Sequence, residues 1–390
     1  MTSKSRWLIF LVSTPLVVLA AVGGLIGANA APAPQKAITH LRVFEDVVSL
    51  IMSSYVEEAD PDKVMEGAMR GLADGLDPLS SYLTPEEVTI VRTNTPPLPT
   101  GDVGLVVSRQ FYLRIVGVRD GSPAARAGLR TNDYIRGIDN KPTREISAFT
   151  GMRLLRGAPG SKVELVVLRG NAADPHTVTL TREALTGQSV TTTKLPSGPA
   201  LVRVSSFAEG TATALGTVFD GLQKSGVSGA VIDLRGTANG PMEEGIAAAR
   251  LFVKSGTIAT RSERNQANVK IEAASADGRI TVPVVLLVSN GTAGPSEIFA
   301  AALNGNKRAD LVGEPTAGLA AVQKLVSLPE GRGLWMTYAR YLTLQGDPIH
   351  ERGLRPTVAV ESPNVAFDDP PPANDDMLTK ALERLKSPGK

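Results

Sequence analysis

The sequence predicts an α/β protein with an N-terminal helical region, a small mainly β module and a larger α/β core. Three observations predict this class. Apolar residues near the N-terminus have helical spacing, short β-rich segments separated by turns follow, and strands alternate with helices in the second half. The chain of 390 residues is long enough for two or three domains, and 42% hydrophobic residues suffice for a sizeable core.

The first 30 residues have the pattern of an export signal. Lys4 and Arg6 precede an uncharged apolar run at residues 8–27, and Ala28-Asn29-Ala30 fits the small-x-small pattern of a cleavage site. The run is long enough to span a bilayer if it is retained. We therefore expect residues 1–30 to be a signal peptide or membrane anchor. The protein would then be periplasmic, or anchored to the outer face of the inner membrane.

Residues 35–95 are expected to form a helical region. Apolar residues recur along one face of the first helix, and Asp60 with Pro61 marks the start of a second. The apolar residues of the first face are Phe44, Val47, Val48, Ile51 and Tyr55. The proline-rich segment TPPLPTG, residues 95–101, then reads as a linker to the next domain.

Two further domains and a tail follow the linker. Residues 101–184 contain five β-rich segments and two short helical segments, with Gly121 and Gly128 at turns. Residues 186–362 alternate strands and helices, which predicts a largely parallel sheet covered by helices. Residues 363–390 are an acidic, proline-rich tail that ends in a short amphipathic helix.

Composition excludes several classes of function. The 41 basic and 39 acidic residues nearly cancel, which argues against a nucleic-acid partner. The absence of cysteine excludes thiol catalysis, thiolate metal sites and disulfides. His40, His176 and His350 are scattered without metal-ligand spacing, so no metal and no cofactor is expected.

One turn of the core has the form of a site for a nucleophile. The stretch NGTAGPSEIFAAAL, residues 290–303, follows the apolar run TVPVVLLVS and opens a predicted helix. A small-residue turn between a buried strand and a helix is a common position for an attacking side chain. The residues at this turn are Gly294 and Pro295, and neither carries a nucleophile.

Residues 101–184 resemble a bacterial PDZ domain. The motifs that carry the resemblance are GSPAARAGLRTNDYIRGIDNKP and RGAPGSKVELVVLR, while another small β-barrel is the alternative. PDZ domains bind a C-terminal tail as an added strand and hold its carboxylate with backbone N–H groups. By this resemblance the carboxylate loop is GDVGLVV, with Gly104, Leu105 and Val106 as the donors.

Nearly all of the mature chain resembles the carboxyl-terminal processing peptidases, or tail-specific proteases. Besides the PDZ motifs, the resemblance is carried by FEDVVSLIMSSYVEEADPDKVMEGAMRGLADGLDPLSSYLTPEE, GAVIDLRG, SEIFAAAL, RADLVGEPTAG and IHERGLRPTVAVE. It implies a ClpP/crotonase-like core and a Ser/Lys dyad, in which a neutral lysine deprotonates the serine. It also implies N-terminal helices that can mediate dimerisation.

The positions of the dyad are occupied by other residues. The family's serine stands two residues before Ser-Glu-Ile, which is Gly294 here, and its lysine follows Gly-Glu-x-Thr-x-Gly, which is Leu319. The interval, 319 − 294 = 25 residues, is the one that the family keeps, so the alignment has not slipped. Pro295 stands where the family uses a backbone N–H in the oxyanion hole. Gln323 stands where the family has a glutamine, although it fits an ordinary strand residue as well.

Two readings of function remain open. The first is an exported pseudopeptidase that binds C-terminal tails of envelope proteins, including misfolded ones, as a homodimer or paired with an active relative. The second is an active serine endopeptidase that cleaves near C-termini through a relocated dyad, Ser296 with Lys324. Against the second reading, a serine in the first helical turn usually bonds backbone N–H groups, and Lys324 points away from the face of Gln323.

Overall fold

The computed structural model describes residues 35–170, 174–196, 198–363, 365–367, 369 and 372–386. The predicted signal or anchor, residues 1–30, lies outside this part of the chain. Among the described residues no helix is both long enough and apolar enough to cross a membrane. The chain divides into two compact units, Met1–Met69 and Arg70–Lys390.

The first unit is helical in its described part. It contains α2 (Gln35–Ser54) and most of α3 (Pro61–Asp74), joined by a short connection. Several large apolar side chains of α2 are exposed to solvent, among them Leu41 at 66% and Leu50 at 63%. Exposed apolar side chains that gather on one helix can mark a surface where another protein binds.

The second unit begins with the end of α3 and a short connecting region, β1 (Ser81–Leu83) and α4 (Pro85–Thr93). Thr84 caps α4 through a capping box with Glu87, and Pro85 occupies the first helical turn. The PDZ module, residues 101–184, follows. Its elements are β2 (Gly101–Asp102), β3 (Leu105–Gln110), β4 (Tyr112–Val118), α5 (Pro123–Arg126), β5 (Tyr134–Ile138), β6 (Lys141–Pro142), η1 (Thr143–Glu145), α6 (Ala148–Leu154), β7 (Lys162–Leu168), β8 (His176–Thr181) and β9 (Glu183–Ala184).

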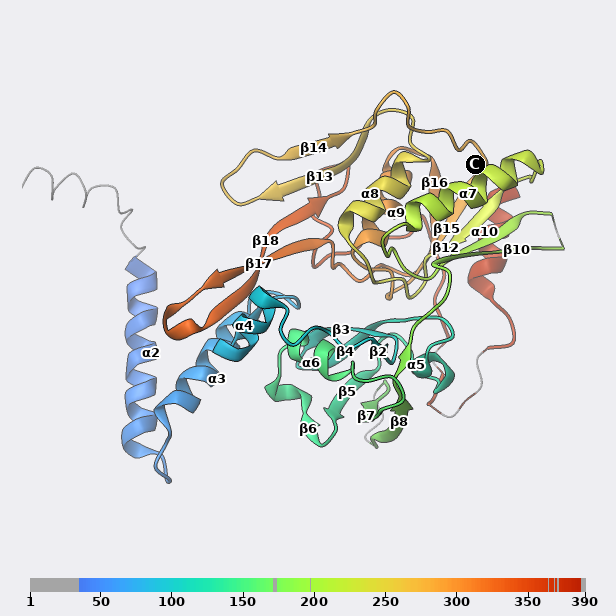
Figure 1. Ribbon diagram of the computed structural model, residues 1–390. Helices are drawn as coiled ribbons and strands as arrows, with labels where there is room; N and C mark the ends of the chain where they lie inside the picture. Colours follow the sequence, from blue (N-terminus) through green and yellow to red (C-terminus); the bar gives the residue numbers. More distant parts are fainter. Residues whose placement is uncertain are drawn as a thin grey trace, which may run out of the picture. The chain divides into compact units, whose positions relative to one another are not determined.

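The PDZ module is an antiparallel sheet around its own apolar core. Its strand order is β3-β4-β5-β7-β8, so β3 lies at the edge and pairs with β4 alone among the strands of the described residues. Leu113, Ile115 and Ile135 are fully buried in this module. The edge position of β3 leaves one side of its backbone without a strand partner (Figure 1).

The core is built on a six-stranded sheet with the order β10-β11-β12-β15-β16-β19. All neighbouring pairs are parallel except β10 with β11. The elements of this part are β10 (Val190–Lys194), β11 (Ala200–Val204), α7 (Thr211–Lys224), β12 (Ala230–Asp233), α8 (Met242–Arg250), β15 (Val284–Val288), α9 (Pro295–Gly305), β16 (Ala309–Gly313), β19 (Val358–Ala359) and α10 (Asp376–Lys386).

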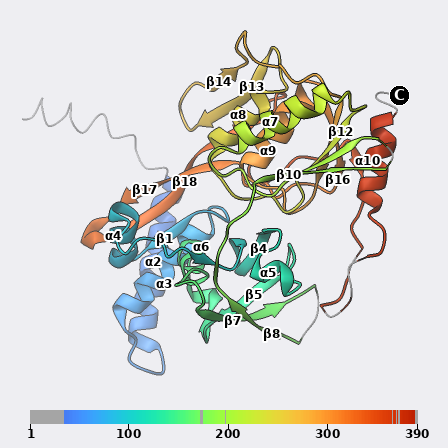
Figure 2. The same cartoon turned by 45° about the vertical axis from the view of Figure 1, so that its right-hand side comes forward.

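The central strand β15 shows why helices cover both faces of this sheet. All five of its residues, VVLLV, are buried, as in a parallel strand with no face open to water. Successive side chains point to opposite faces. Leu286 packs into the cluster that contains α7, α8 and α9, whereas Leu287 packs into the cluster with Met377 of α10. Figures 1 and 2 show α10 on the far side of the sheet from α8 and α9.

The sequence predicted residues 363–390 as an acidic, proline-rich tail that ends in a short helix, and it did not predict where that helix packs. Met377 and Ala381 of α10 are buried against the parallel sheet. The terminal helix therefore closes one face of the core.

A second sheet lies beside the core sheet and contains the strand that follows Leu319. It consists of β1, β13 (Thr257–Glu263), β14 (Val269–Glu272), β17 (Ala321–Ser327) and β18 (Gly333–Leu342), with η2 (Pro329–Gly331) at the turn of the β17–β18 hairpin. The strand order is β1-β18-β13-β14, and β17 pairs with β18. This sheet fixes the register of the hairpin in which Gln323 lies opposite Thr337.

Two glycines give a paired test of this backbone. Gly240 has φ +125°, and a Cβ there would lie 1.9 Å from the Phe207 carbonyl oxygen, so Gly240→Ala should lower the free energy of unfolding by about 2 to 4 kcal/mol. Gly221 lies exposed within α7, and a Cβ there would meet nothing within 4 Å. Gly221→Ala should therefore raise the free energy of unfolding by about 0.5 to 1 kcal/mol. Urea denaturation of both variants measures the difference, and equal effects would contradict the tight approach at Gly240.

Candidate active site

Gly294 lies in a sharp turn between a strand and a helix. Gly294 follows β15 and is the N-cap of α9, with φ +59° and ψ −117°. Residues with a side chain rarely adopt this conformation, but a hydrolase nucleophile is mounted on a strained turn of this kind. A Cβ at this position would lie 3.5 Å from Met242 Cε and 4.0 Å from the Leu319 carbonyl oxygen. The two predicted dyad positions are therefore neighbours.

Leu319 is part of an apolar cluster. Leu319 is 8% exposed, and it packs with Val116 of strand β4 in the PDZ module and with Ala293 from the turn before α9. Leu79, Ala238 and Ala317 border the same cluster. None of these side chains can accept or donate a proton, so the cluster offers neither an acid nor a base.

Glu297 joins the two loops that carry positions 294 and 319. Its Oε2 accepts hydrogen bonds from Gly294 N at 3.0 Å and from Leu319 N at 2.8 Å. Its Oε1 accepts from Gly318 N at 2.7 Å and from the Thr316 hydroxyl. Complete burial raises the pKa of Glu297 above its usual value, while these four hydrogen bonds act in the opposite sense.

The turn presents no free backbone donor beside position 294. Pro295 has no N–H, and the N–H of Gly294 is already bonded to Glu297. An oxyanion hole needs donors aimed at the charge that develops in the transition state. This turn cannot supply one from either residue.

The relocated dyad has no support in the geometry. Ser296 is fully buried, and its hydroxyl donates to the Thr237 carbonyl oxygen at 2.6 Å. Lys324 is exposed on β17, with Nζ 4.8 Å from the ring centroid of Tyr338. The retained Gln323 donates from Nε2 to Thr337 Oγ1 at 3.2 Å within the β17–β18 hairpin.

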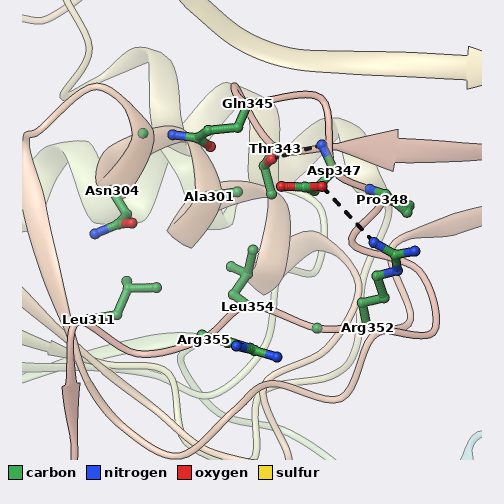
Figure 3. Close-up of a pocket in the computed structure, with 12 residues that line it drawn as sticks. Ala301, Asn304, Leu311, Thr343, Gln345, Asp347, Pro348, Arg352, Leu354 and Arg355 are labelled. Atoms are coloured by element: carbon green, nitrogen blue, oxygen red, sulfur yellow. Dashed lines mark hydrogen bonds and ion pairs between the residues drawn. The ribbon is translucent and has the colours of Figure 1, made fainter.

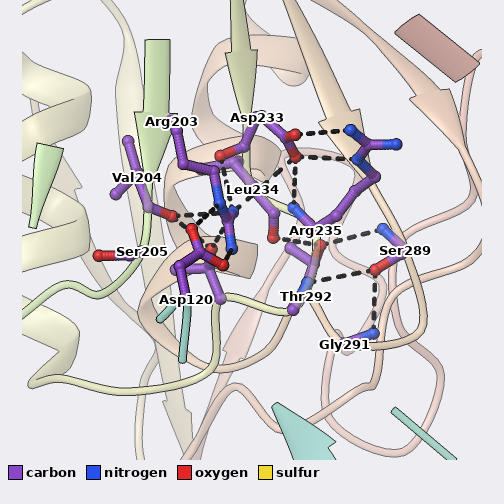
Figure 4. Close-up of polar contacts among 12 residues, drawn as sticks. Asp120, Arg203, Val204, Ser205, Asp233, Leu234, Arg235, Ser289, Gly291 and Thr292 are labelled. Atoms are coloured by element: carbon purple, nitrogen blue, oxygen red, sulfur yellow. Dashed lines mark hydrogen bonds and ion pairs between the residues drawn. The ribbon is translucent and has the colours of Figure 1, made fainter. Parts of the chain in front are cut away.

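An arginine network that the sequence did not predict lies beside the site (Figure 4). Arg203 on β11 binds both carboxylate oxygens of Asp120 in the PDZ module, at 2.7 and 3.0 Å, and also donates to Thr237 Oγ1 at 3.0 Å. Arg235 binds Asp233, with Nη2 2.7 Å from Oδ2, and also binds Asp375 before α10. Through Thr237, the network links the loop that follows β12 to the PDZ module, and no local sequence motif marks it.

The predicted peptide-binding residues line a cavity of 170 Å³ between the PDZ module and the core. Gly104 N already donates to Asp102 Oδ1 at 2.9 Å. The Arg119 N–H bonds the Gly104 carbonyl, so Leu105 and Val118 form a non-hydrogen-bonded pair and the Leu105 N–H points away from β4. The same ladder turns the Val106 N–H toward Gly117. Of the three expected donors, Leu105 is the one left open.

Another cavity, of 770 Å³, lies at the C-terminal end of α9 (Figure 3). Leu311 and Leu354 contribute apolar walls, and Arg352 approaches Asp347 at 4.0 Å across it. Its lining includes none of the residues predicted for catalysis or peptide binding. Within the described part of the chain, no cluster of three or more histidine and acidic side chains could hold a metal ion.

The Glu297 carboxylate can be tested by an isosteric change. Glu297→Gln replaces one acceptor oxygen with an N–H₂ donor that faces hydrogen-bond donors, so it should lower the free energy of unfolding by about 2 to 3 kcal/mol. Glu244→Gln is the matched control. Glu244 also bonds two backbone N–H groups, those of Gly210 and Ala212, but it is partly exposed, and its loss should cost about 0.5 to 1 kcal/mol. Denaturant unfolding measures both, and an equal loss in the two variants would contradict the special role of Glu297.

Family comparisons agree with this architecture. Residues 199–360 match a model described as peptidase family S41, residues 114–169 match a PDZ domain, and residues 27–87 match the N-terminal domain of the activating protease CtpB. The carboxy-terminal processing protease CtpA of Bacillus subtilis is 30% identical over 364 residues, which cover 92% of this chain and 78% of that protein. The carboxyl-terminal-processing protease of Synechocystis is 32% identical over 316 residues, or 79% and 74% of the two chains.

A solved structure gives the same result for the fold. The photosystem II D1 C-terminal processing protease matches with a TM-score of 0.68 and 27% identity, over 88% of this chain and 97% of that one. The predicted fold class, with N-terminal helices, a PDZ domain and an α/β peptidase core, is thereby confirmed. The chain belongs to the carboxyl-terminal processing peptidases of family S41.

Proposed function

We propose that this chain is a catalytically inactive member of its family that captures C-terminal tails without cutting them. The observation that carries the proposal is the pair Gly294 and Leu319, which lie side by side where the family's chemistry needs a serine and a lysine. Glycine has no group that can attack a carbonyl, and leucine cannot take a proton.

Two further features of the site support inactivity. The backbone beside position 294 has no free N–H donor, because Pro295 lacks one and Gly294 donates to Glu297. The fully buried Val116 of the PDZ module packs with Leu319 and Ala293, so apolar side chains fill the space beside the turn. An enzyme needs a preorganised polar environment at this place.

The free edge of the PDZ sheet supports tail binding. Strand β3 is an edge strand, and the N–H of Leu105 points away from its neighbour β4. An extended peptide can add to such an edge by main-chain hydrogen bonds. The 170 Å³ cavity beside it is lined by Met152 of α6 as well as by Leu105 and Val106 of β3.

Export and pairing belong to the same proposal. The charged start and apolar run of residues 1–30 support export to the periplasm or tethering outside the inner membrane, where the tails of exported and misfolded proteins are the ligands. The exposed apolar side chains of α2, including Leu41 and Leu50, support pairing with a second copy or with an active relative.

Stepwise restoration tests the loss of catalysis. The native chain should not hydrolyse a substrate with an apolar C-terminus. Gly294→Ser with Leu319→Lys should give little turnover, because Pro295 still withholds an oxyanion donor. Adding Pro295→Ala should raise the rate about a hundredfold. The turnover of one tail-bearing protein by all three chains is the measurement.

Two results of this experiment would contradict these expectations. Cleavage by the native chain that is lost in Ser296→Ala would support the relocated dyad and contradict inactivity. A double variant as fast as the triple variant would show that the Pro295 position plays no part in stabilising the oxyanion.

Tail binding has its own test on the native chain. A peptide with an apolar C-terminus should bind the mature protein, and amidation of its terminus should weaken binding about tenfold, because the carboxylate loses its charge-assisted hydrogen bonds. Fluorescence anisotropy with a labelled peptide measures both affinities. Equal affinity for the acid and the amide would contradict carboxylate recognition.

A further inference from the structure

The carboxylate loop has too few donors to hold a tail by its backbone alone. Gly104 N is bonded to Asp102 Oδ1, and the Val106 N–H faces Gly117 across the β3–β4 ladder. This leaves the N–H of Leu105. A terminal carboxylate has two oxygens and a full negative charge, and it loses its hydration when it enters the cavity. A second, positively charged donor is therefore needed.

Two arginines line the same cavity, and one of them is already engaged. Arg156 lies 3.0 Å from Asp102 Oδ2, so its charge is balanced by the acid that also holds Gly104. Arg119 is half-buried at the end of β4 and lines the cavity together with Leu105. Its neighbour Asp120 is bound by Arg203 of the core and does not neutralise it.

Arg119 has the properties of an unused cation. Within the part of the chain that the structure describes, its guanidinium forms no hydrogen bond and no ion pair. The other side of the cavity is formed by core residues, among them Ser206 and Asn239, which carry no charge. The cavity thus holds one positive charge without a counter-charge, next to the open N–H of the carboxylate loop.

We propose that Arg119 binds the terminal carboxylate of the captured tail, together with the N–H of Leu105. This inference rests on the proposed tail-binding function and names the residue that gives it specificity for a free C-terminus. The position of Asp102 explains the arrangement, since its carboxylate occupies the donor at Gly104 and leaves the charge of Arg119 to the ligand.

The test measures how much the terminal charge of the peptide contributes to binding, with and without the charge of Arg119. The acid and the amide of one peptide are titrated into the native chain, Arg119→Gln, Arg119→Met and Arg119→Lys. The native chain should prefer the acid about tenfold. In the two neutral variants this preference should fall to about twofold or less, while the affinity for the amide stays within about twofold of the native value. Arg119→Lys should retain most of the preference.

Arg126→Gln is the matched control. Arg126 belongs to the PDZ module, is 54% exposed and pairs with Glu183 outside this cavity, so its loss should leave the preference unchanged. Arg119→Met retains an apolar stem and reports whether lost packing explains any effect of Arg119→Gln. Thermal unfolding of each variant shows whether it is folded.

The outcomes distinguish the role of Arg119 from the proposed tail-binding function. If the neutral variants keep the tenfold preference, Arg119 does not bind the carboxylate, although tail binding itself stands. If the native chain binds acid and amide equally or binds neither, the proposed tail-binding function fails. If both neutral variants unfold, Arg119 serves the fold and the proposal is overturned.

Discussion

The site depends on one buried carboxylate. Glu297 receives the backbone N–H groups of Gly294, Gly318 and Leu319 together with the Thr316 hydroxyl, and so ties the start of α9 to the loop before β17. These loops belong to different parts of the fold, and besides Glu297 a hydrogen bond from the Ala317 N–H to the Thr292 carbonyl oxygen at 3.0 Å joins them. A carboxylate buried without partners is costly, so four donors to one acid fix the position of both loops closely.

The same constraint accounts for the shape of the site in a chain with glycine at 294 and leucine at 319. The strained turn at Gly294 and its approach to Leu319 follow from the hydrogen bonds to Glu297 and need neither a serine nor a lysine. With leucine at 319, the loop packs on Val116 of the PDZ module, which adds apolar burial at this junction.

The sequence predicted those parts of the fold that depend on local pattern. Strand β15 and helix α9 are marked by apolar runs in the sequence, and the structure brings the loops of Gly294 and Leu319 together. The sequence could not predict the role of Glu297 or the Arg203–Asp120 pair, because both depend on contacts between distant segments. The burial of Met377 in α10 was missed for the same reason. The available signal for a buried polar group was Glu297 itself, which lies in the first turn of α9 and directly precedes the apolar stretch IFAAAL.

The open edge of β3 imposes a requirement on the protein whenever no ligand is bound. An unpaired strand edge is a template for any extended backbone, including that of another copy, and main-chain hydrogen bonds do not discriminate between sequences. One end of this edge is shielded, because the N–H of Arg109 is bonded to the Pro78 carbonyl at 3.2 Å. At the other end, Leu105 and Val106 line the 170 Å³ cavity between the PDZ module and the core. An extended chain that pairs with this edge therefore meets an occupied N–H at one end and this cavity at the other.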